Sequence, residues 1–249
     1  MKQNTAYSAQ EAEKVEISNW HSDECSINEL IRMIEAYHGA ELFGICCGTG
    51  YLYHELIQYY SKIHAIDLSV NILDYNNRRS NDCFGQQIGV NCNNVAEYLQ
   101  NNDLHIKSND LLFKNCLEIL DSPQIQEAIH LTEFGHIFLI NTINRDKHSF
   151  FYLLKKNGFK FVSDSISYIT EERLDTLCCK LGNVIETSVV EQEISLIGWL
   201  LYYNCNQEEV SKFIDVLDQM EPEQLYEYGI KKEKGQYLLQ RYEKVYCIG

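Results

Sequence analysis

Basic residues are scarce in this sequence. Its 249 residues include 21 lysines and arginines against 36 aspartates and glutamates, which gives a formal net charge of −15 at pH 7. Proteins that bind nucleic acid place a basic face against the phosphates, and so acidic a chain has little from which to build one. We therefore expect no nucleic acid among its partners.

Proline is also rare, and no long apolar run is present. Two prolines, with no Gly/Ser-rich spacer and no internal repeat, predict a single domain over residues 1–249. The longest apolar run, residues 194–203, is too short to cross a bilayer, and residues 1–20 lack the apolar core of a signal peptide. These features predict a cytoplasmic protein without a membrane partner. The oligomeric state stays open, with a homodimer among the options.

The cysteines lack the spacing of a metal site. Ten are present, but none forms a CxxC pair, and the adjacent pairs at 46–47 and 178–179 do not suit zinc. In a reducing compartment such residues stay free thiols and behave as small apolar side chains. We expect no metal cofactor.

What the sequence does contain is an apolar strand that runs into a glycine turn. ELFGICCGTGYL, residues 41–52, predicts a strand, a turn at Gly48, Thr49 and Gly50, and then a helix. KIHAID follows as a second strand with Asp67 at its carboxyl end. Strand, helix and strand in this order favour a parallel sheet, in which ligands bind beyond the carboxyl ends of the strands. Glycines let a ligand approach the backbone, and Asp67 could accept hydrogen bonds from both hydroxyls of a ribose. A purely structural turn and a helix-capping Asp67 are the alternatives.

The rest of the chain predicts further strands and helices. LHIKSND (104–110) is the candidate third strand and HIFLIN (136–141) the fourth. The Asn-rich segment 80–103 predicts mostly a loop, with room for a short helix at NVAEYLQ (94–100). Asp110, at the end of the third strand, would share a rim with Asp67 and could meet an adenine amino group. Helices are expected near 123, 147–158, 171–181 and 207–220, and YEKVYCIG at the end resembles an alternating edge strand.

CGTGYL followed by HAIDLS resembles the first two motifs of the class I S-adenosylmethionine-dependent methyltransferases. The resemblance covers roughly residues 40–162 and implies an α/β fold with a doubly wound, mostly parallel, seven-stranded sheet. Residues 1–38 are expected to be helical, because Ile27, Leu30, Ile31 and Ile34 recur at spacings of three and four residues, and they would form a cap. A cofactor-binding core would cover 39–163, and a substrate cover with closing strands would cover 164–249. S-adenosylmethionine would be the cofactor and S-adenosylhomocysteine the product. The resemblance places these residues at the cofactor: Cys46, Gly48, Thr49, Gly50, Asp67, Leu68, Asp110, Leu111 and Asn141.

Two features depart from the pattern of that family. Three positions before CGTG the family usually has an acid that helps to hold the amino group of the cofactor, but here that residue is Gly44, and Cys46 stands where glycine is usual. The 43 residues from Asp67 to Asp110 are about twice the usual spacing. Either the Asn-rich segment is an insertion, or the third strand lies elsewhere.

The candidates for chemistry lie outside these motifs. Methyl transfer depends mainly on in-line positioning, and it needs a base only where the acceptor arrives protonated, a role that histidine commonly fills. His21 and His148 are the candidate bases, and Trp20, Tyr7 and Tyr168 are candidate walls of a substrate pocket. Ordinary packing or surface exposure is the alternative explanation for each of them.

The hypothesis that unites these features is S-adenosylmethionine-dependent methyl transfer to a small molecule, as in specialised metabolite biosynthesis. Two alternatives remain. The same cofactor could instead donate its aminocarboxypropyl arm, an idea that the missing acid at Gly44 favours. A non-catalytic relative that binds a partner protein would fit the altered first motif and the acidic segment 208–229.

Overall fold

The computed structural model describes residues 24–46, 51–67, 73, 87–89, 92–101, 108–132, 134–145, 150–159, 169–202 and 205–249. The chain divides into two compact units. The first comprises residues 1–141, 175–188 and 244–249, and the second comprises residues 142–174 and 189–243. The single domain expected over residues 1–249 stays a prediction.

The core of the first unit is a parallel sheet. β1 (Glu41–Ile45) lies between β2 (Lys62–Asp67) and β4 (Asn109–Lys114), β2 pairs with β3 (Gln87–Gly89), and β4 pairs with β5 (His136–Ile143). All four pairings are parallel. Strands of this kind are covered on both faces, which is why LFGI and DLLF are continuous buried runs.

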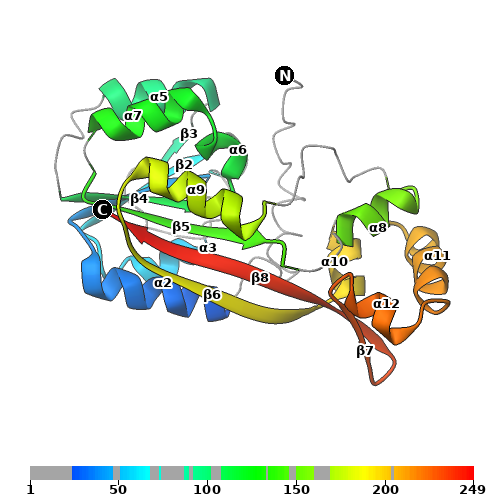
Figure 1. Ribbon diagram of the computed structural model, residues 1–249. Coiled ribbons are helices and arrows are strands. Elements are labelled where there is room, and N and C mark those ends of the chain that lie inside the picture. The colour runs from blue at the N-terminus through cyan, green and yellow to red at the C-terminus, as the bar shows by residue number, and fades with distance from the viewer. Residues whose placement is uncertain are drawn as a thin grey trace. The chain divides into compact units, whose positions relative to one another are not determined.

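The complete sheet has the order β3-β2-β1-β4-β5-β8-β6 (Figure 1). β6 is Val184–Ser195, β8 is Gln236–Ile248, and β7 (Ile230–Glu233) pairs with β8 outside this order. The predicted doubly wound α/β fold with seven strands in line is therefore confirmed.

The last strand occupies an inner position in the sheet, so the edge strand predicted from YEKVYCIG is wrong. β8 lies between β5 and β6, and its residues 243–248 are all buried. Asn183 and Gly249 exchange backbone hydrogen bonds of 2.8 and 2.9 Å, and Thr187 Oγ1 donates to the carbonyl of Val245. These bonds make β6 and β8 antiparallel.

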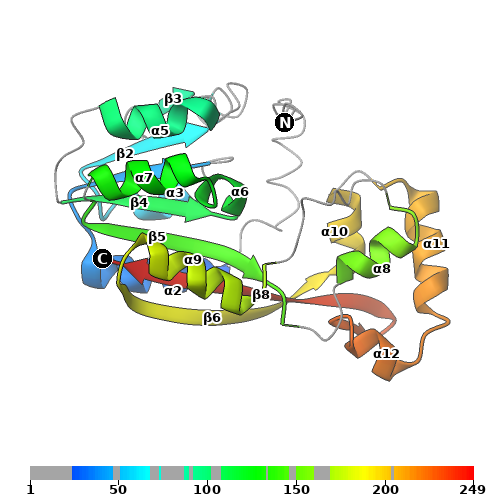
Figure 2. The same cartoon turned by 45° about the horizontal axis from the view of Figure 1, so that its top comes forward.

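Helices cover both faces of the parallel strands (Figures 1 and 2). α2 (Glu24–Tyr37) and α3 (Tyr51–Leu56) lie on one face, and α5 (Cys92–Asn101) and α7 (Pro123–Thr132) lie on the other. The first unit also contains α6 (Leu117–Leu120) and most of α9 (Glu171–Leu181). Of the apolar residues predicted to face the core from this helix, Ile27, Leu30 and Ile34 are buried and Ile31 is half-buried.

The second unit contains four short helices and β7. The helices are α8 (Phe150–Lys156), α10 (Leu196–Tyr202), α11 (Gln207–Leu217) and α12 (Pro222–Tyr226). Trp199 meets Phe150 edge-on with ring centres 5.4 Å apart, and Phe213 meets Phe159 at 5.1 Å. Aromatic packing of this kind gives the unit a core of its own.

The third strand lies inside the Asn-rich segment, so the prediction of a third strand over 104–110 and of a loop over most of 80–103 is wrong. β3 is Gln87–Gly89, and NDLLFK forms β4. Gly89 follows Asp67 by 22 residues, about half the spacing to Asp110. HIFLIN consequently belongs to the fifth strand, and Asn141 lies there rather than on the fourth.

Candidate functional site

The order of the strands creates a topological switch point beside β1. From β1 the chain passes through α3 to β2 on one side, whereas after β3 it crosses to β4 on the other side of β1. The connections beyond the carboxyl ends of β1 and β4 therefore diverge. In open sheets of this type, such a switch point is where ligands bind.

The strand register shows which residues lie at this edge. Ile45, the last residue of β1, pairs with Ile66 and Phe113. Cys46, Asp67 and Lys114 each follow one of these three residues, so they stand at one level, at the carboxyl ends of β1, β2 and β4. The register thus brings Cys46 and Asp67 to the same rim, and their contact with a cofactor stays a prediction.

Asn141 lies close to the same level. Lys114 pairs with Ile140 on β5, and Asn141 is the next residue, only 8% exposed. β5 itself continues to Ile143. The structure therefore places Asn141 at the carboxyl end of a parallel strand, as expected, although that strand is the fifth.

Two residues at this edge of the sheet have a left-handed backbone conformation. Cys46, directly after β1, has φ of 57°, and Asn115, directly after β4, has φ of 51°. The amide of Asn115 donates to Ile140 O at 2.9 Å, and Cys116 Sγ lies 3.7 Å from Ile45 O. Non-glycine residues in the left-handed region are costly and tend to occur at functional sites. Sequence reasoning missed Asn115 and Cys116, whose signal is a pair of small polar residues directly after the run LLFK that ends β4.

A tyrosine fills the space beside Gly44, the residue that stands in place of the family's acid. A Cβ built on Gly44 would lie 1.9 Å from Tyr53 Oη and 2.4 Å from Tyr53 Cζ. Tyr53 comes from α3 and is 3% exposed. Any side chain at position 44 would collide with this phenol, which explains the glycine in physical terms.

Asp110 and Leu111 do not lie at the carboxyl rim, so their predicted role beside the adenine is wrong. β4 begins at Asn109, and Asp110 pairs with Leu42 near the start of β1. Leu42 also pairs with Ile63, four residues before Asp67. With a rise of about 3.3 Å per residue, Asp110 and Asp67 lie at levels roughly 13 Å apart along the strands. Leu111 is fully buried in the sheet.

Asp110 instead organises the amino-terminal edge of the sheet. Its Oδ2 accepts hydrogen bonds from the amide of Gly39 at 2.6 Å and from Tyr60 Oη at 3.0 Å, and its Oδ1 accepts from the amide of His136 at 3.1 Å. The side chain is completely buried, and this burial raises the pKa of Asp110 above its usual range despite these bonds. Donors from three segments thus converge on one carboxyl group, which is a structural arrangement.

The other predicted site residues lie outside the described part of the chain: Tyr7, Trp20, His21, Gly48, Thr49, Gly50, Leu68, His148 and Tyr168. Among the described residues, no three His, Cys, Asp or Glu side chains gather as metal ligands would. The helices within those ranges include none that is long and apolar enough to span a membrane.

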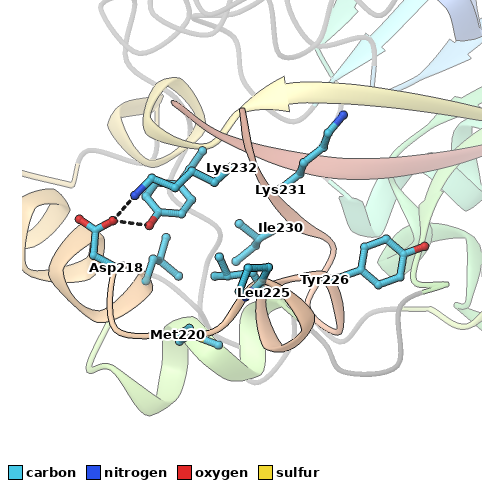
Figure 3. A pocket seen from close by; sticks show the side chains of 10 residues that line it. Asp218, Met220, Leu225, Tyr226, Ile230, Lys231 and Lys232 are labelled. Atoms are coloured by element: carbon cyan, nitrogen blue, oxygen red, sulfur yellow. Dashed lines mark hydrogen bonds and ion pairs between the residues drawn. The ribbon is translucent and has the colours of Figure 1, made fainter. Parts of the chain in front are cut away.

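The second unit holds a pocket of about 420 Å³ (Figure 3). Apolar side chains supply most of its lining: Leu217, Met220, Pro222, Leu225 and Ile230. At one side Asp218 accepts a hydrogen bond from Tyr237 Oη at 2.6 Å and pairs with Lys232, while Lys231 pairs with Glu193 at 3.2 Å. The charges around the pocket are thus neutralised within the protein, and the space suits an apolar group.

No protein-family model and no curated protein sequence matches this chain. Similarity to solved structures is nevertheless extensive. A candidate methyltransferase from Bacillus halodurans C-125 is 16% identical, with a TM-score of 0.67 over 91% of this chain and 97% of that one. A SAM-dependent methyltransferase from Geobacter sulfurreducens, in complex with S-adenosylhomocysteine, is 12% identical, with a TM-score of 0.50 over 90% of this chain and 89% of that one.

A third similar structure contains two small molecules. Phosphoethanolamine N-methyltransferase 2 from Haemonchus contortus, in complex with phosphomonomethylethanolamine and S-adenosylhomocysteine, is 14% identical. Its TM-score is 0.56 over 98% of this chain and 59% of that one. At such low identities the similarity establishes the fold. It confirms the class I methyltransferase fold that CGTGYL and HAIDLS predicted.

Proposed function

We propose that this chain is an S-adenosylmethionine-dependent methyltransferase acting on a small molecule. The observation that carries the proposal is the common level of Cys46 and Asp67 at the carboxyl ends of β1 and β2, beside the switch point between β1 and β4. A ligand with a ribose and a second polar arm fits this edge, because Asp67 stands one strand away from the switch point.

The residues at this edge suit the proposed cofactor. Asp67 would accept hydrogen bonds from the two ribose hydroxyls, since a carboxylate can accept both. Cys46 begins the turn below the amino-acid arm, and Asn141 and Asn115 offer amide groups at the ends of β5 and β4. S-adenosylmethionine, when bound, supplies a methyl group activated by its sulfonium. The chain has to bind and orient the cofactor and the acceptor, which is most of what methyl transfer requires.

A small acceptor is favoured by charge. The net charge of −15 opposes nucleic acid, and the Haemonchus enzyme of the same fold holds a small phosphorylated amine. We propose the segment 164–249, together with Tyr7, Trp20, His21, His148 and Tyr168, for acceptor selection, in a cytoplasmic enzyme of small-molecule biosynthesis.

The test combines cofactor binding with product analysis. The purified full chain is titrated with S-adenosylmethionine and S-adenosylhomocysteine, then incubated with methyl-labelled S-adenosylmethionine and a fractionated cell extract. We expect micromolar binding, label in the small-molecule fraction and S-adenosylhomocysteine as the product. Methylthioadenosine as the product would replace methyl transfer by aminocarboxypropyl transfer. A folded protein that binds neither ligand would favour a non-catalytic, partner-binding relative.

A further inference from the structure

Tyr53 occupies a defined place below the cofactor edge. Gly44, whose missing side chain it replaces, is the residue before the last of β1 and pairs with Ala65 on β2 and Leu112 on β4. The hydroxyl therefore sits one strand residue below the rim, beside Ala65 and Leu112 in the register. A phenol hydroxyl can donate one hydrogen bond and accept others.

The same register places Tyr53 and Asp67 on one face of the sheet. Side chains of paired residues on neighbouring strands point the same way, and those two residues apart along a strand share a face. Asp67 follows Ala65 by two residues, and Ala65 pairs with Gly44. Asp67 thus lies two residues along β2 and one strand across from Gly44, which separates these two backbone positions by roughly 8 Å. A ligand whose ribose lies on Asp67 would bring its next arm within reach of the Tyr53 hydroxyl if that arm crosses from β2 to β1.

The second arm of the proposed cofactor needs a hydrogen-bond acceptor near position 44. The amino-acid end of S-adenosylmethionine carries an ammonium group, which is a donor and needs acceptors. A carboxylate at position 44 is excluded by the phenol, 1.9 Å from where its Cβ would stand. Glu41 cannot substitute, because it lies at the first position of β1 and pairs with His64 Nε2 at 2.8 Å. The Tyr53 hydroxyl, in contrast, is an acceptor that lies at the right level.

We propose that Tyr53 is a cofactor-binding residue whose hydroxyl accepts a hydrogen bond from the amino group of S-adenosylmethionine, in the space that a side chain at position 44 would otherwise fill. The proposal rests on the proposed function, because it presumes this cofactor. In this arrangement the absence of an acid at position 44 does not remove the acceptor for the amino group. The acceptor is the hydroxyl of Tyr53 on α3 instead of a carboxylate on β1.

The experiment pairs a one-atom change in the protein with a one-group change in the ligand. Wild type and Tyr53→Phe are titrated by calorimetry with S-adenosylhomocysteine and with its analogue lacking the α-amino group. Tyr60→Phe is the matched control, because Tyr60 is equally buried and its hydroxyl donates to Asp110 at the opposite edge. A hydrogen bond to a charged group predicts that Tyr53→Phe weakens S-adenosylhomocysteine by about 10- to 100-fold. The deaminated analogue should bind wild type and Tyr53→Phe alike, and Tyr60→Phe should leave both affinities unchanged.

The six affinities, for three proteins and two ligands, separate the possible outcomes. Partial misfolding of Tyr53→Phe lowers the affinity for both ligands by the same factor, so the ratio between the ligands still reports the contact. Equal weakening of both ligands, or no weakening of either, overturns the role of Tyr53 while the proposed function stands. Failure of folded wild-type protein to bind S-adenosylhomocysteine overturns the proposed function and this proposal together.

Discussion

Asp110 provides a direct test of the assignment of the two sheet edges. Asp110→Asn keeps the shape of the side chain but replaces one acceptor oxygen by an NH₂ group. One oxygen can still serve the amide of Gly39 and Tyr60 Oη, which both contact Oδ2. The amide of His136, 3.1 Å from Oδ1, then faces a donor and loses its acceptor. An orphaned buried donor costs about 1–3 kcal/mol, and removal of the buried charge returns part of that. We expect a net loss of about 1–2 kcal/mol in the free energy of unfolding at pH 7.

The assay measures stability and cofactor affinity on the same variant. Urea unfolding followed by circular dichroism should show a lower midpoint for Asp110→Asn with an unchanged slope. Calorimetry should give wild-type affinity for S-adenosylhomocysteine, because Asp110 lies at the opposite edge of the sheet from Asp67. Unchanged stability together with a tenfold or greater loss of affinity would refute the placement of Asp110 at the amino-terminal edge.

Three further predictions address pH, a buried ion pair and the thiols. Burial raises the native pKa of Asp110, so the native state keeps a proton that the unfolded chain loses near pH 4. The free energy of unfolding of wild type should therefore fall relative to that of Asp110→Asn as the pH rises through the native pKa, as measured by urea unfolding. In the second unit Arg241 and Glu243 form an ion pair with both side chains at most 3% exposed. Glu243→Ala should lower the free energy of unfolding by about 3–5 kcal/mol, because it leaves a buried charge unpaired, and the double variant Arg241→Met/Glu243→Leu should recover most of that loss. Equal losses of stability in the two variants would contradict this. In maleimide labelling followed by mass spectrometry, S-adenosylhomocysteine should slow the reaction of the half-buried Cys46 and Cys116 but not that of the exposed Cys25 and Cys179. Burial raises the pKa of the Cys178 thiol to about 12, so Cys178 should stay unlabelled in the native protein.

Elements with a strong local pattern were predictable from the sequence. The strand KIHAID and the helix over 171–181 have the predicted bounds, because each joins a clear periodicity to clear ends. β3 was missed because three residues are too few to display an alternation. That omission shifted the numbering of the later strands. Asp110 was expected at the wrong edge because the predicted strand over 104–110 ends where β4 begins, at Asn109.

The candidate site was predictable only where it follows the chain locally. Cys46 and Asp67 come directly after strands that the sequence shows, and the register brings them to one level. Tyr53, Asn115 and Cys116 depend on contacts that no local pattern encodes: a phenol from α3 over β1, and a thiol from the end of β4 beside Ile45. Gly44, which looked like a missing acid, is required by the packing of Tyr53.

The most direct test of the central claim is the calorimetric titration of wild type, Asp67→Asn and Asp110→Asn with S-adenosylhomocysteine. We expect micromolar binding by wild type and by Asp110→Asn. Folded Asp67→Asn should bind about 10- to 100-fold more weakly, because a charged acceptor of the ribose hydroxyls is lost. Absence of binding by folded wild-type protein, or full affinity in Asp67→Asn, would contradict a cofactor site at the carboxyl ends of β1 and β2.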